Sequence, residues 1–403
     1  MECGKLGLTV TLTIFTVALL ATCRPALAQQ ETILHSFNPK GGDGINPSAC
    51  LILDAAGDLY GTTVSGGTYG RGTAFELIPK AGGGWTEKVL HSFIPNGKDA
   101  VNPSAGLIFD SAGNLYGTAE GGGTYGHGAV FELIPRPRGG WAEKVLYSFF
   151  DSGIDGAVPA AGLILDSAGN LFGTTAFDTA FELTPTASGQ WKETILHEFG
   201  IGTDGAEPYG GLVFDAAGNL YGTTFLGGAH NAGTVFELTP APGGGWTETV
   251  LYSFSLNAFS GGAYPMAGLV RDAAGNLYGT TNNNSTVFEL TLTAGGNWTE
   301  TVLHSFSSNG IDGYAPMAGV IFDTAGNLYG TTTSGGLYLY GTVFELTPAA
   351  GGIWTETLLH DFGNGTDGSD PRAGLIFDAA GNLYGTTYNG GAYNGGTVFQ
   401  IKP

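Results

Sequence analysis

The chain has 403 residues, of which 71 are glycine, 42% are hydrophobic, 12% are aromatic and only 12% are charged. So many aromatic residues exclude a disordered glycine-rich chain and favour many short apolar strands joined by turns. The net charge of −21 repels phosphate backbones and anionic lipids, so nucleic acids and membrane surfaces are not expected as partners.

Residues 1–28 have the features of an export signal. Lys5 precedes an uncharged apolar run over residues 6–21. The small-x-small pattern of residues 26–28 then predicts cleavage just before Gln29. One acidic and two basic residues leave with this segment, which changes the net charge from −21 to −22.

The mature chain is expected to be one domain, residues 29–403, in the periplasm or secreted from the cell, with no membrane insertion after signal removal. A lipid anchor at Cys23 is the alternative, although the threonine before it is unusual at such a site. Cys50 is the one cysteine outside the signal, so an internal disulfide is not available to stabilise the fold.

One sequence unit recurs seven times along the mature chain. Its clearest marker is the aromatic residue of an N-L-Y-G-T segment, which returns at intervals of 49 to 57 residues. The seven copies are Tyr60, Tyr116, Phe172, Tyr221, Tyr278, Tyr329 and Tyr384. This period is typical of a four-stranded propeller blade and is too long for a rung of a β-helix.

Four apolar segments make up each unit, and the second unit shows them clearly. We expect strand A at 106–109, strand B at 114–118, strand C at 129–134 and strand D at 141–149. Val, Ile, Phe, Tyr and Thr fill these segments, as packed strands require. Several are apolar on both faces, which predicts blades that are sandwiched between neighbouring blades.

The turns between these strands have a regular chemistry. In the Asp-x-Ala-Gly-Asn turn between A and B, Gly113 can take positive φ while the aspartate caps the turn amides. The C–D connection has a constant length, with five residues between Pro79 and Trp85. A constant length sets the hairpin register, which predicts that Glu76 lies beside Lys88.

The two ends of the repeat region predict a closed ring. The chain opens with a D-type segment at 31–37 and finishes with a C-type segment at 396–403. Seven complete blades form only if the first segment completes the last blade, and this closure removes exposed sheet edges. We therefore predict an all-β, seven-bladed β-propeller with four antiparallel strands per blade.

The repeat resembles the GloVer tandem-repeat family of exported bacterial proteins, which are described as carrying a choice of anchors. The resemblance rests on D-x-A-G-N-L-Y-G-T, G-G-x-Y-x-x-G-T-V-F-E-L-T-P and W-T-E-T-V-L-H-S-F, and it covers nearly all of residues 31–403. It implies export and a repeat domain, but it brings no established activity and no catalytic residues.

The loops between strands B and C vary in length and should share one face of the ring with the D-to-A crossings. Binding sites concentrate in loops that vary on a rigid scaffold. The candidate ligand-binding residues in these loops are Tyr69, Arg71, Tyr125, His127, His230, Tyr338, Tyr340 and Tyr393. The alternative is that each tyrosine packs against the loop of the neighbouring blade.

The crossings share an Asp-Gly-x-x-Pro pattern. The aspartates are Asp43, Asp99, Asp155, Asp204, Asp312 and Asp367. We interpret them as turn residues that lead into a strand. As an alternative, they could form a carboxylate ring at one mouth of the central channel that holds structural calcium, although each loop offers few ligands. No other cofactor is expected.

Neither a nucleophile elbow nor a phosphate-binding loop nor a two-histidine metal motif occurs in the sequence. Residues that are identical in every blade also lack the asymmetry that catalysis needs. We therefore favour a monomeric, non-enzymatic binding module for a carbohydrate or a cell-surface protein. A hydrolase or lyase acting on a carbohydrate or lactone is the alternative; its polar residues would have to converge on one pocket. The candidates for that pocket are Arg71, His127, Asp178, His230 and Arg372. A structural spacer without a ligand is the third hypothesis.

Overall fold

The computed structural model describes residues 30–150, 155–200, 203–256, 261–307 and 309–402. The export signal at 1–28 and the lipid-anchor alternative at Cys23 lie outside the described residues. All named elements of the described chain are strands, and none of these residues forms a helix that could cross a membrane.

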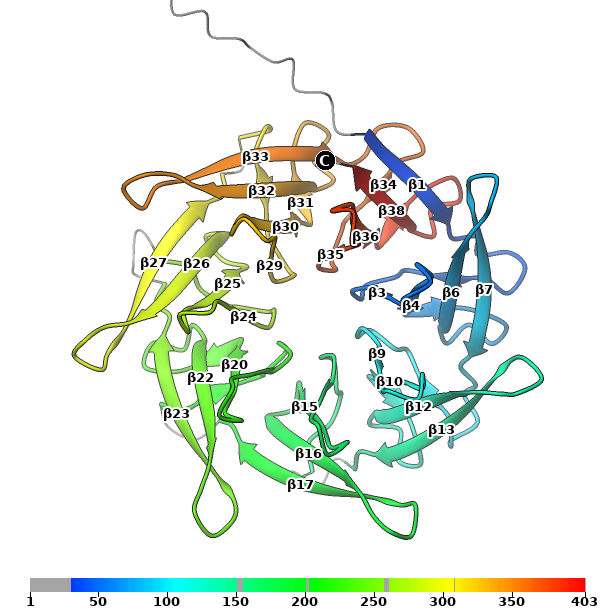
Figure 1. Ribbon diagram of the computed structural model, residues 1–403, viewed down its shortest axis with the longest axis horizontal. Helices are drawn as coiled ribbons and strands as arrows, with labels where there is room; N and C mark the ends of the chain where they lie inside the picture. The colour runs from blue at the N-terminus through cyan, green and yellow to red at the C-terminus, as the bar shows by residue number, and fades with distance from the viewer. Residues whose placement is uncertain (1–29, 151–154, 201–202, 257–260, 308, 403) are drawn as a thin grey trace, which may run out of the picture.

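Seven four-stranded antiparallel sheets surround a central axis as the blades of a propeller (Figure 1). The innermost strands, A, are β3 (Ile52–Leu53), β9 (Ile108–Phe109), β14 (Ile164–Leu165), β19 (Val213–Phe214), β24 (Val270–Arg271), β29 (Ile321–Phe322) and β35 (Ile376–Phe377). Next to them, the B strands are β4 (Leu59–Thr63), β10 (Leu115–Ala119), β15 (Leu171–Thr175), β20 (Leu220–Thr224), β25 (Leu277–Thr281), β30 (Leu328–Thr332) and β36 (Leu383–Thr387). The predicted fold class is confirmed.

The longer C and D strands form the outer half of each blade. The C strands are β6 (Thr73–Pro79), β12 (Ala129–Pro135), β16 (Thr179–Pro185), β22 (Thr234–Pro240), β26 (Thr286–Leu292), β32 (Thr342–Pro348) and β38 (Thr397–Lys402). The D strands are β7 (Trp85–Ser92), β13 (Trp141–Ser148), β17 (Trp191–Glu198), β23 (Trp246–Ser253), β27 (Trp298–Ser305), β33 (Trp354–Asp361) and β1 (Gln30–Ser36). The D strands lie at the perimeter of the ring (Figure 1).

The N-terminal strand completes the last blade, as predicted. Strand β1 pairs antiparallel with β38, from Gln30 opposite Lys402 to Ser36 opposite Thr397. The expected hairpin register is also present, because Glu76 pairs with Lys88 and the two side chains form a 2.6 Å ion pair. Constant loop length therefore determined the register.

Five blades carry an additional two-stranded ribbon between the B–C loop and the preceding crossing. The ribbons are β2 (Gly44–Ile45) with β5 (Ser65–Gly66), β8 (Ala100–Val101) with β11 (Gly121–Gly122), β18 (Gly205–Ala206) with β21 (Leu226–Gly227), β28 (Gly313–Tyr314) with β31 (Ser334–Gly335), and β34 (Gly368–Ser369) with β37 (Asn389–Gly390). The crossings and B–C loops therefore share one face of the ring, which we call the loop face.

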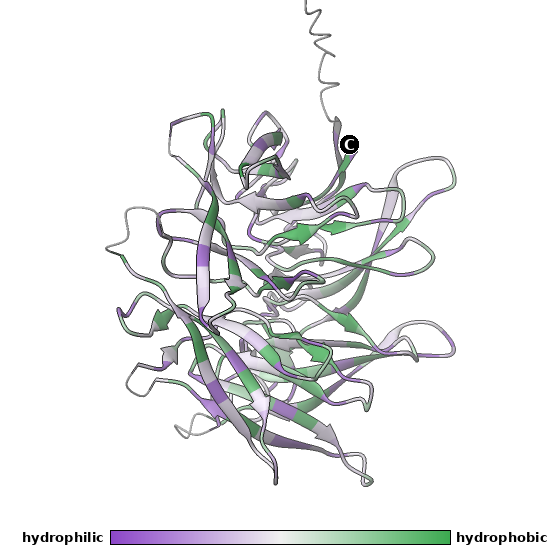
Figure 2. Cartoon of the chain, turned by 60° about the vertical axis from the view of Figure 1, so that its left-hand side comes forward, coloured by the Kyte–Doolittle hydropathy of each residue, from purple (hydrophilic) through white to green (hydrophobic). Residues whose placement is uncertain are grey.

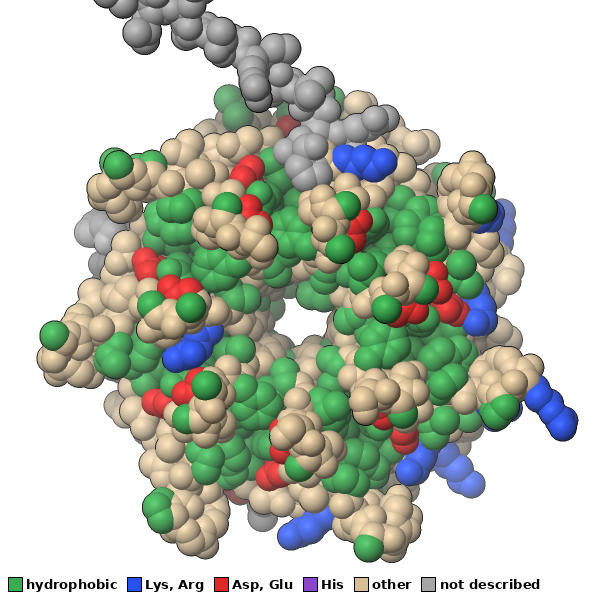
Figure 3. Space-filling model, in the orientation of Figure 1, with side chains coloured by type: hydrophobic (Ala, Val, Ile, Leu, Met, Phe, Trp, Pro, Cys, Tyr) green, Lys and Arg blue, Asp and Glu red, His purple; other side chains and the backbone are tan. Residues whose placement is uncertain are grey.

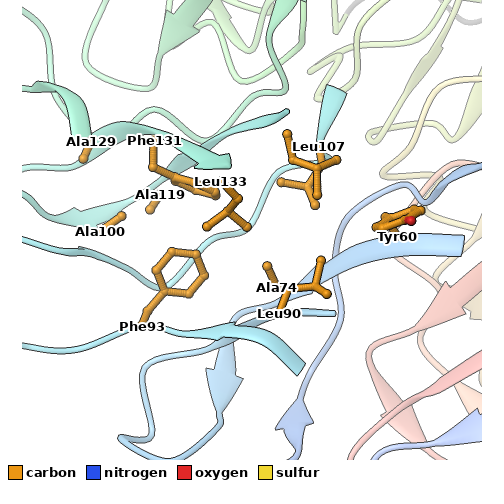
Figure 4. Packing of buried hydrophobic residues seen from close by; sticks show 11 residues of the cluster. Tyr60, Ala74, Leu90, Phe93, Ala100, Leu107, Ala119, Ala129, Phe131 and Leu133 are labelled. Atoms are coloured by element: carbon orange, nitrogen blue, oxygen red, sulfur yellow. The ribbon is translucent and has the colours of Figure 1, made fainter. Parts of the chain in front are cut away.

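Hydrophobic packing occurs between blades rather than in one central core. Seven clusters of buried residues each join two neighbouring blades, and hydrophobic residues concentrate in the strands (Figure 2). In the cluster of Figure 4, Phe93 follows the first blade and meets Phe131 of the second edge-on, with 5.0 Å between ring centroids. Because each blade buries both faces, its strands are apolar on both sides.

The G-T pair of the N-L-Y-G-T segment has two packing roles. A Cβ on Gly117 would lie 2.6 Å from Cζ of Phe131, so only glycine admits that ring. Thr118 donates a 2.8 Å hydrogen bond to the carbonyl oxygen of Ala161 in the next blade. Equivalent bonds between neighbouring blades come from Thr62, Thr174, Thr223, Thr280, Thr331 and Thr386. They form a ring of polar contacts inside the apolar clusters.

The predicted A–B turn chemistry is confirmed. Asp110 accepts hydrogen bonds from the amides of Ala112 and Asn114, each at 2.8 Å, and Gly113 has a φ of 84°. The aspartate side chain thus accepts hydrogen bonds from turn amides that have no partner in the sheet. The shared turn residues are therefore explained by local structure alone.

Candidate functional site

The residue after each crossing proline lies at the axis on the loop face. These seven residues together line one cavity of about 340 Å³. They are Ser48, Ser104, Ala160, Tyr209, Met266, Met317 and Arg372. Because all seven blades contribute, this cavity is the mouth of the central channel. Figure 3 shows the channel as an opening through the ring.

The mouth is chemically asymmetric although the blades are nearly uniform. Consecutive blades contribute two serines, an alanine, a tyrosine, two methionines and an arginine. Val64, Glu120 and Tyr388, which follow the B strands of three blades, complete the lining. A polar side with hydroxyl groups and one carboxylate therefore differs from an apolar side with thioethers.

Arg372 is held in a defined orientation at the mouth. Its Nε and Nη2 donate to Oδ2 of Asp370 at 2.9 and 2.7 Å. Its Cζ lies 3.8 Å from the ring centroid of Tyr388, so the guanidinium stacks on that ring. The Arg372 side chain is still 37% exposed, so the group is oriented but remains accessible.

An arc of aromatic rings borders the apolar side. Tyr209 meets Phe225 edge-on at 5.8 Å, and Phe225 lies 5.0 Å from Tyr264. Burial, with Glu207 nearby, raises the pKa of Tyr209 above its usual value. Tyr209 is therefore a neutral phenol at physiological pH.

The loop residues that the sequence predicts as ligand-binding lie mainly at the outer rim. The loop tips are tied to the D strands, since the amides of Thr68 and Thr124 each donate to a serine hydroxyl at the end of the D strand of the same blade. Tyr69 is half exposed, and Tyr125 packs at 4.9 Å on Phe150 of the following crossing. Arg71, His127, His230, Tyr338 and Tyr393 belong to the same set of loops and do not line the mouth.

Tyr340 is the predicted residue that the structure brings next to the mouth. It lines a hollow of about 670 Å³ between blades six and seven, together with Met317, Asp370 and Arg372. Leu339 and the amides of Asn389 and Asn394 also line this hollow. The mouth and the hollow share Met317 and Arg372, so they form one continuous surface.

Apart from Arg372, which the enzyme hypothesis named, sequence reasoning missed the residues of the mouth. Their signal is present in the alignment of the repeats, because the position after the crossing proline changes in character while the proline itself does not. The structure also does not bring together the polar residues that the enzyme hypothesis requires in one pocket. Arg71, His127, Asp178 and His230 lie in loops of four different blades, and of that set only Arg372 lines the mouth.

The crossing aspartates do not surround the channel mouth, which corrects that alternative. Oδ2 of Asp99 lies 3.0 Å from Nε2 of His91 on strand β7, at the perimeter of the ring. Asp43, Asp204 and Asp367 make the same contact with a D-strand histidine, and Asp155 contacts a D-strand tyrosine. Asp99 also accepts the amide of Ile94 at 2.9 Å, which confirms its turn role. The D strand forms the outer edge of the blade, and the aspartate lies beside this strand and not at the channel.

A second acidic residue lies beside each crossing aspartate, and sequence reasoning did not identify it. It is a glutamate of the D strand of the next blade, two positions after the tryptophan in the six D strands that have one. Burial and the Asp99 carboxylate raise the pKa of Glu143 to about 8. The signal was available, because every D strand carries this glutamate: Glu31, Glu87, Glu143, Glu193, Glu248, Glu300 and Glu356.

A sequence model of the Gloeobacter/Verrucomicrobia repeat matches residues 19–183, 178–324 and 281–403. The resemblance inferred from the repeat motifs is thereby confirmed. No curated protein matches the chain in sequence.

Solved structures match in fold. A putative 6-phosphogluconolactonase from Bacteroides uniformis is 14% identical with a TM-score of 0.51, and the match covers 79% of this chain and 85% of that one. An ancestral GH74 enzyme is 13% identical with a TM-score of 0.57, and the match covers 90% of this chain but 48% of that one. At this identity the likeness shows the propeller fold alone.

Proposed function

The chain belongs to the Gloeobacter/Verrucomicrobia repeat family, and we propose that this member is an exported, monomeric, non-enzymatic binding module for a neutral carbohydrate. The observation that carries the proposal is the asymmetric mouth on an otherwise uniform ring. Repeated residues build the scaffold, and variation confined to one concave surface is typical of a binding site.

The side chains around the mouth and the adjoining hollow fit a sugar. The exposed ring of Tyr340 offers a flat apolar face to the C–H groups of a pyranose. The oriented guanidinium of Arg372 and the amides of Asn389 and Asn394 offer donors for its hydroxyl groups. With a chain charge of −21, a neutral sugar is favoured over an acidic one.

Isothermal titration calorimetry of the purified chain with neutral oligosaccharides tests this function. We expect Tyr340→Ala to weaken binding at least tenfold, which corresponds to about 1.4 kcal/mol. Tyr69→Ala is the matched control, because this tyrosine is exposed to a similar degree in the loop of another blade. We expect the control to bind within twofold of the wild type.

Two results would contradict the proposal. Loss of binding in Tyr69→Ala but not in Tyr340→Ala would move the site from the mouth to the rim. If no neutral oligosaccharide binds, while a protein of the cell surface does, the ligand class is wrong and the module recognises protein.

A further inference from the structure

The same polar cluster recurs where neighbouring blades meet at the perimeter of the ring. In one cluster, His91 comes from strand β7, Asp99 from the crossing that follows it, and Glu143 from strand β13 of the next blade. One ligand atom of each residue lies within 4.8 Å of the other two. The same geometry is found for His197, Asp204 and Glu248, for His304, Asp312 and Glu356, and for Glu31, His360 and Asp367.

These clusters contain buried carboxylate oxygens without a hydrogen-bond partner. Asp99 is only 5% exposed and Asp312 only 8%, and Oδ1 of each has no partner. Oε1 of Glu143 and of the equivalent glutamate in every other blade is also buried without a partner. Two carboxylates at one buried point repel each other, and an unpaired buried acceptor is costly. A cation at this point would offset the repulsion between the two carboxylates and would also give the unpaired oxygens a partner.

Two junctions have tyrosine at the histidine position, and the one formed by Tyr147 shows what the histidine clusters lack. The hydroxyl of Tyr147 lies 2.5 Å from Oδ1 of Asp155 and 2.8 Å from Oε2 of Glu193. The phenol oxygen therefore contacts both carboxyl groups. The shorter imidazole of His91 contacts Asp99 at 3.0 Å and has no such contact with Glu143. The histidine clusters thus leave a point between three ligand atoms that the Tyr147 hydroxyl fills in its own cluster.

We propose that the four His-Asp-Glu clusters are binding sites for a divalent transition-metal ion of the zinc class, which connects neighbouring blades. One imidazole nitrogen and two carboxylate oxygens are ligands that zinc takes, with water as a fourth. Calcium prefers sites made of oxygen ligands alone, so the nitrogen ligand favours zinc over the structural calcium considered as an alternative for the aspartates. The sites are distant in the fold from the channel mouth, so this proposal is independent of the proposed carbohydrate ligand.

The chain supplies its own matched substitution. Because tyrosine occupies the histidine position in two blades, His91→Tyr should remove one metal ligand while the junction keeps a residue that it already accepts. The reverse change, Tyr147→His, should create one more cluster with Asp155 and Glu193. The metal content of the purified chain is measured by mass spectrometry of the elements after saturation with zinc and dialysis in the presence of calcium and magnesium.

We expect about four zinc ions per wild-type chain, one fewer in His91→Tyr and one more in Tyr147→His. Circular dichroism in EDTA establishes that each variant is folded; if His91→Tyr does not fold, the gain in Tyr147→His decides. Fewer than one zinc ion per wild-type chain overturns the proposal. An unchanged zinc content in a folded variant also overturns it, because zinc would then bind elsewhere on the acidic surface.

Discussion

Closure of the ring makes a quantitative prediction about Phe37. This residue follows β1 and is fully buried, with its ring edge-on to Phe75 at 5.1 Å. Phe93 follows β7 and is equally buried, with its ring edge-on to Phe131 at 5.0 Å. Replacing either phenylalanine by alanine removes the ring and leaves a cavity, which costs about 3–5 kcal/mol. If β1 completes the last blade, the two substitutions should cost the same.

Differential scanning calorimetry of the wild type and each variant measures this cost as a decrease in Tm. An unfolding entropy of about 2.1 cal/mol/K per residue, summed over about 370 residues, converts this cost into a decrease in Tm of about 4–6 °C. Phe177→Ala is the control, since its ring is 58% exposed. We expect the control to change the free energy of unfolding by no more than about 0.5 kcal/mol.

The comparison of the two core variants decides whether the ring is closed. A decrease of several degrees in Phe93→Ala with less than about 1 °C in Phe37→Ala would refute the reasoning, because the conversion above would then give Phe37 less than about 1 kcal/mol. Strand β1 would in that case not be seated between the last and first blades. Equal decreases would confirm that the N-terminal strand closes the ring.

Three other predictions concern the repeat itself. Gly117→Ala places a Cβ 2.6 Å from Cζ of Phe131 and should cost about 1–3 kcal/mol in urea unfolding; an unchanged midpoint would show that the ring moves freely. Thr118→Val leaves the buried carbonyl of Ala161 without its donor and should also cost about 1–3 kcal/mol, whereas unchanged stability would contradict a role for this bond. Burial and the neighbouring Asp155 raise the pKa of Glu193 from 4.5 to about 9, so the stability that its proton contributes is fully present below pH 4.5 and is lost as the pH rises through 9. The free energy of unfolding should therefore fall across this range, and Glu193→Gln should reduce the slope; equal slopes in both proteins would disprove the assignment.

The sequence by itself determined the blade count, the strand order, the turn chemistry and the ring closure. These features depend on local patterns that repeat, such as the capped A–B turn and the constant C–D length that places Glu76 beside Lys88. Closure followed from the strand types at the two ends of the repeat region. Each of these inferences compares short segments with one another and requires no knowledge of how distant segments meet.

Only the tertiary structure decided which residues form sites. The mouth combines single residues about fifty positions apart, and the first-blade Ser48 and the last-blade Arg372 meet only because the ring returns to its starting point. The His91, Asp99 and Glu143 cluster joins three segments of two blades. Its carboxylate oxygens lack a hydrogen-bond partner only because packing removes water from them. A repeat pattern shows that such residues recur, but their function depends on which copies face one another and on how deeply they are buried.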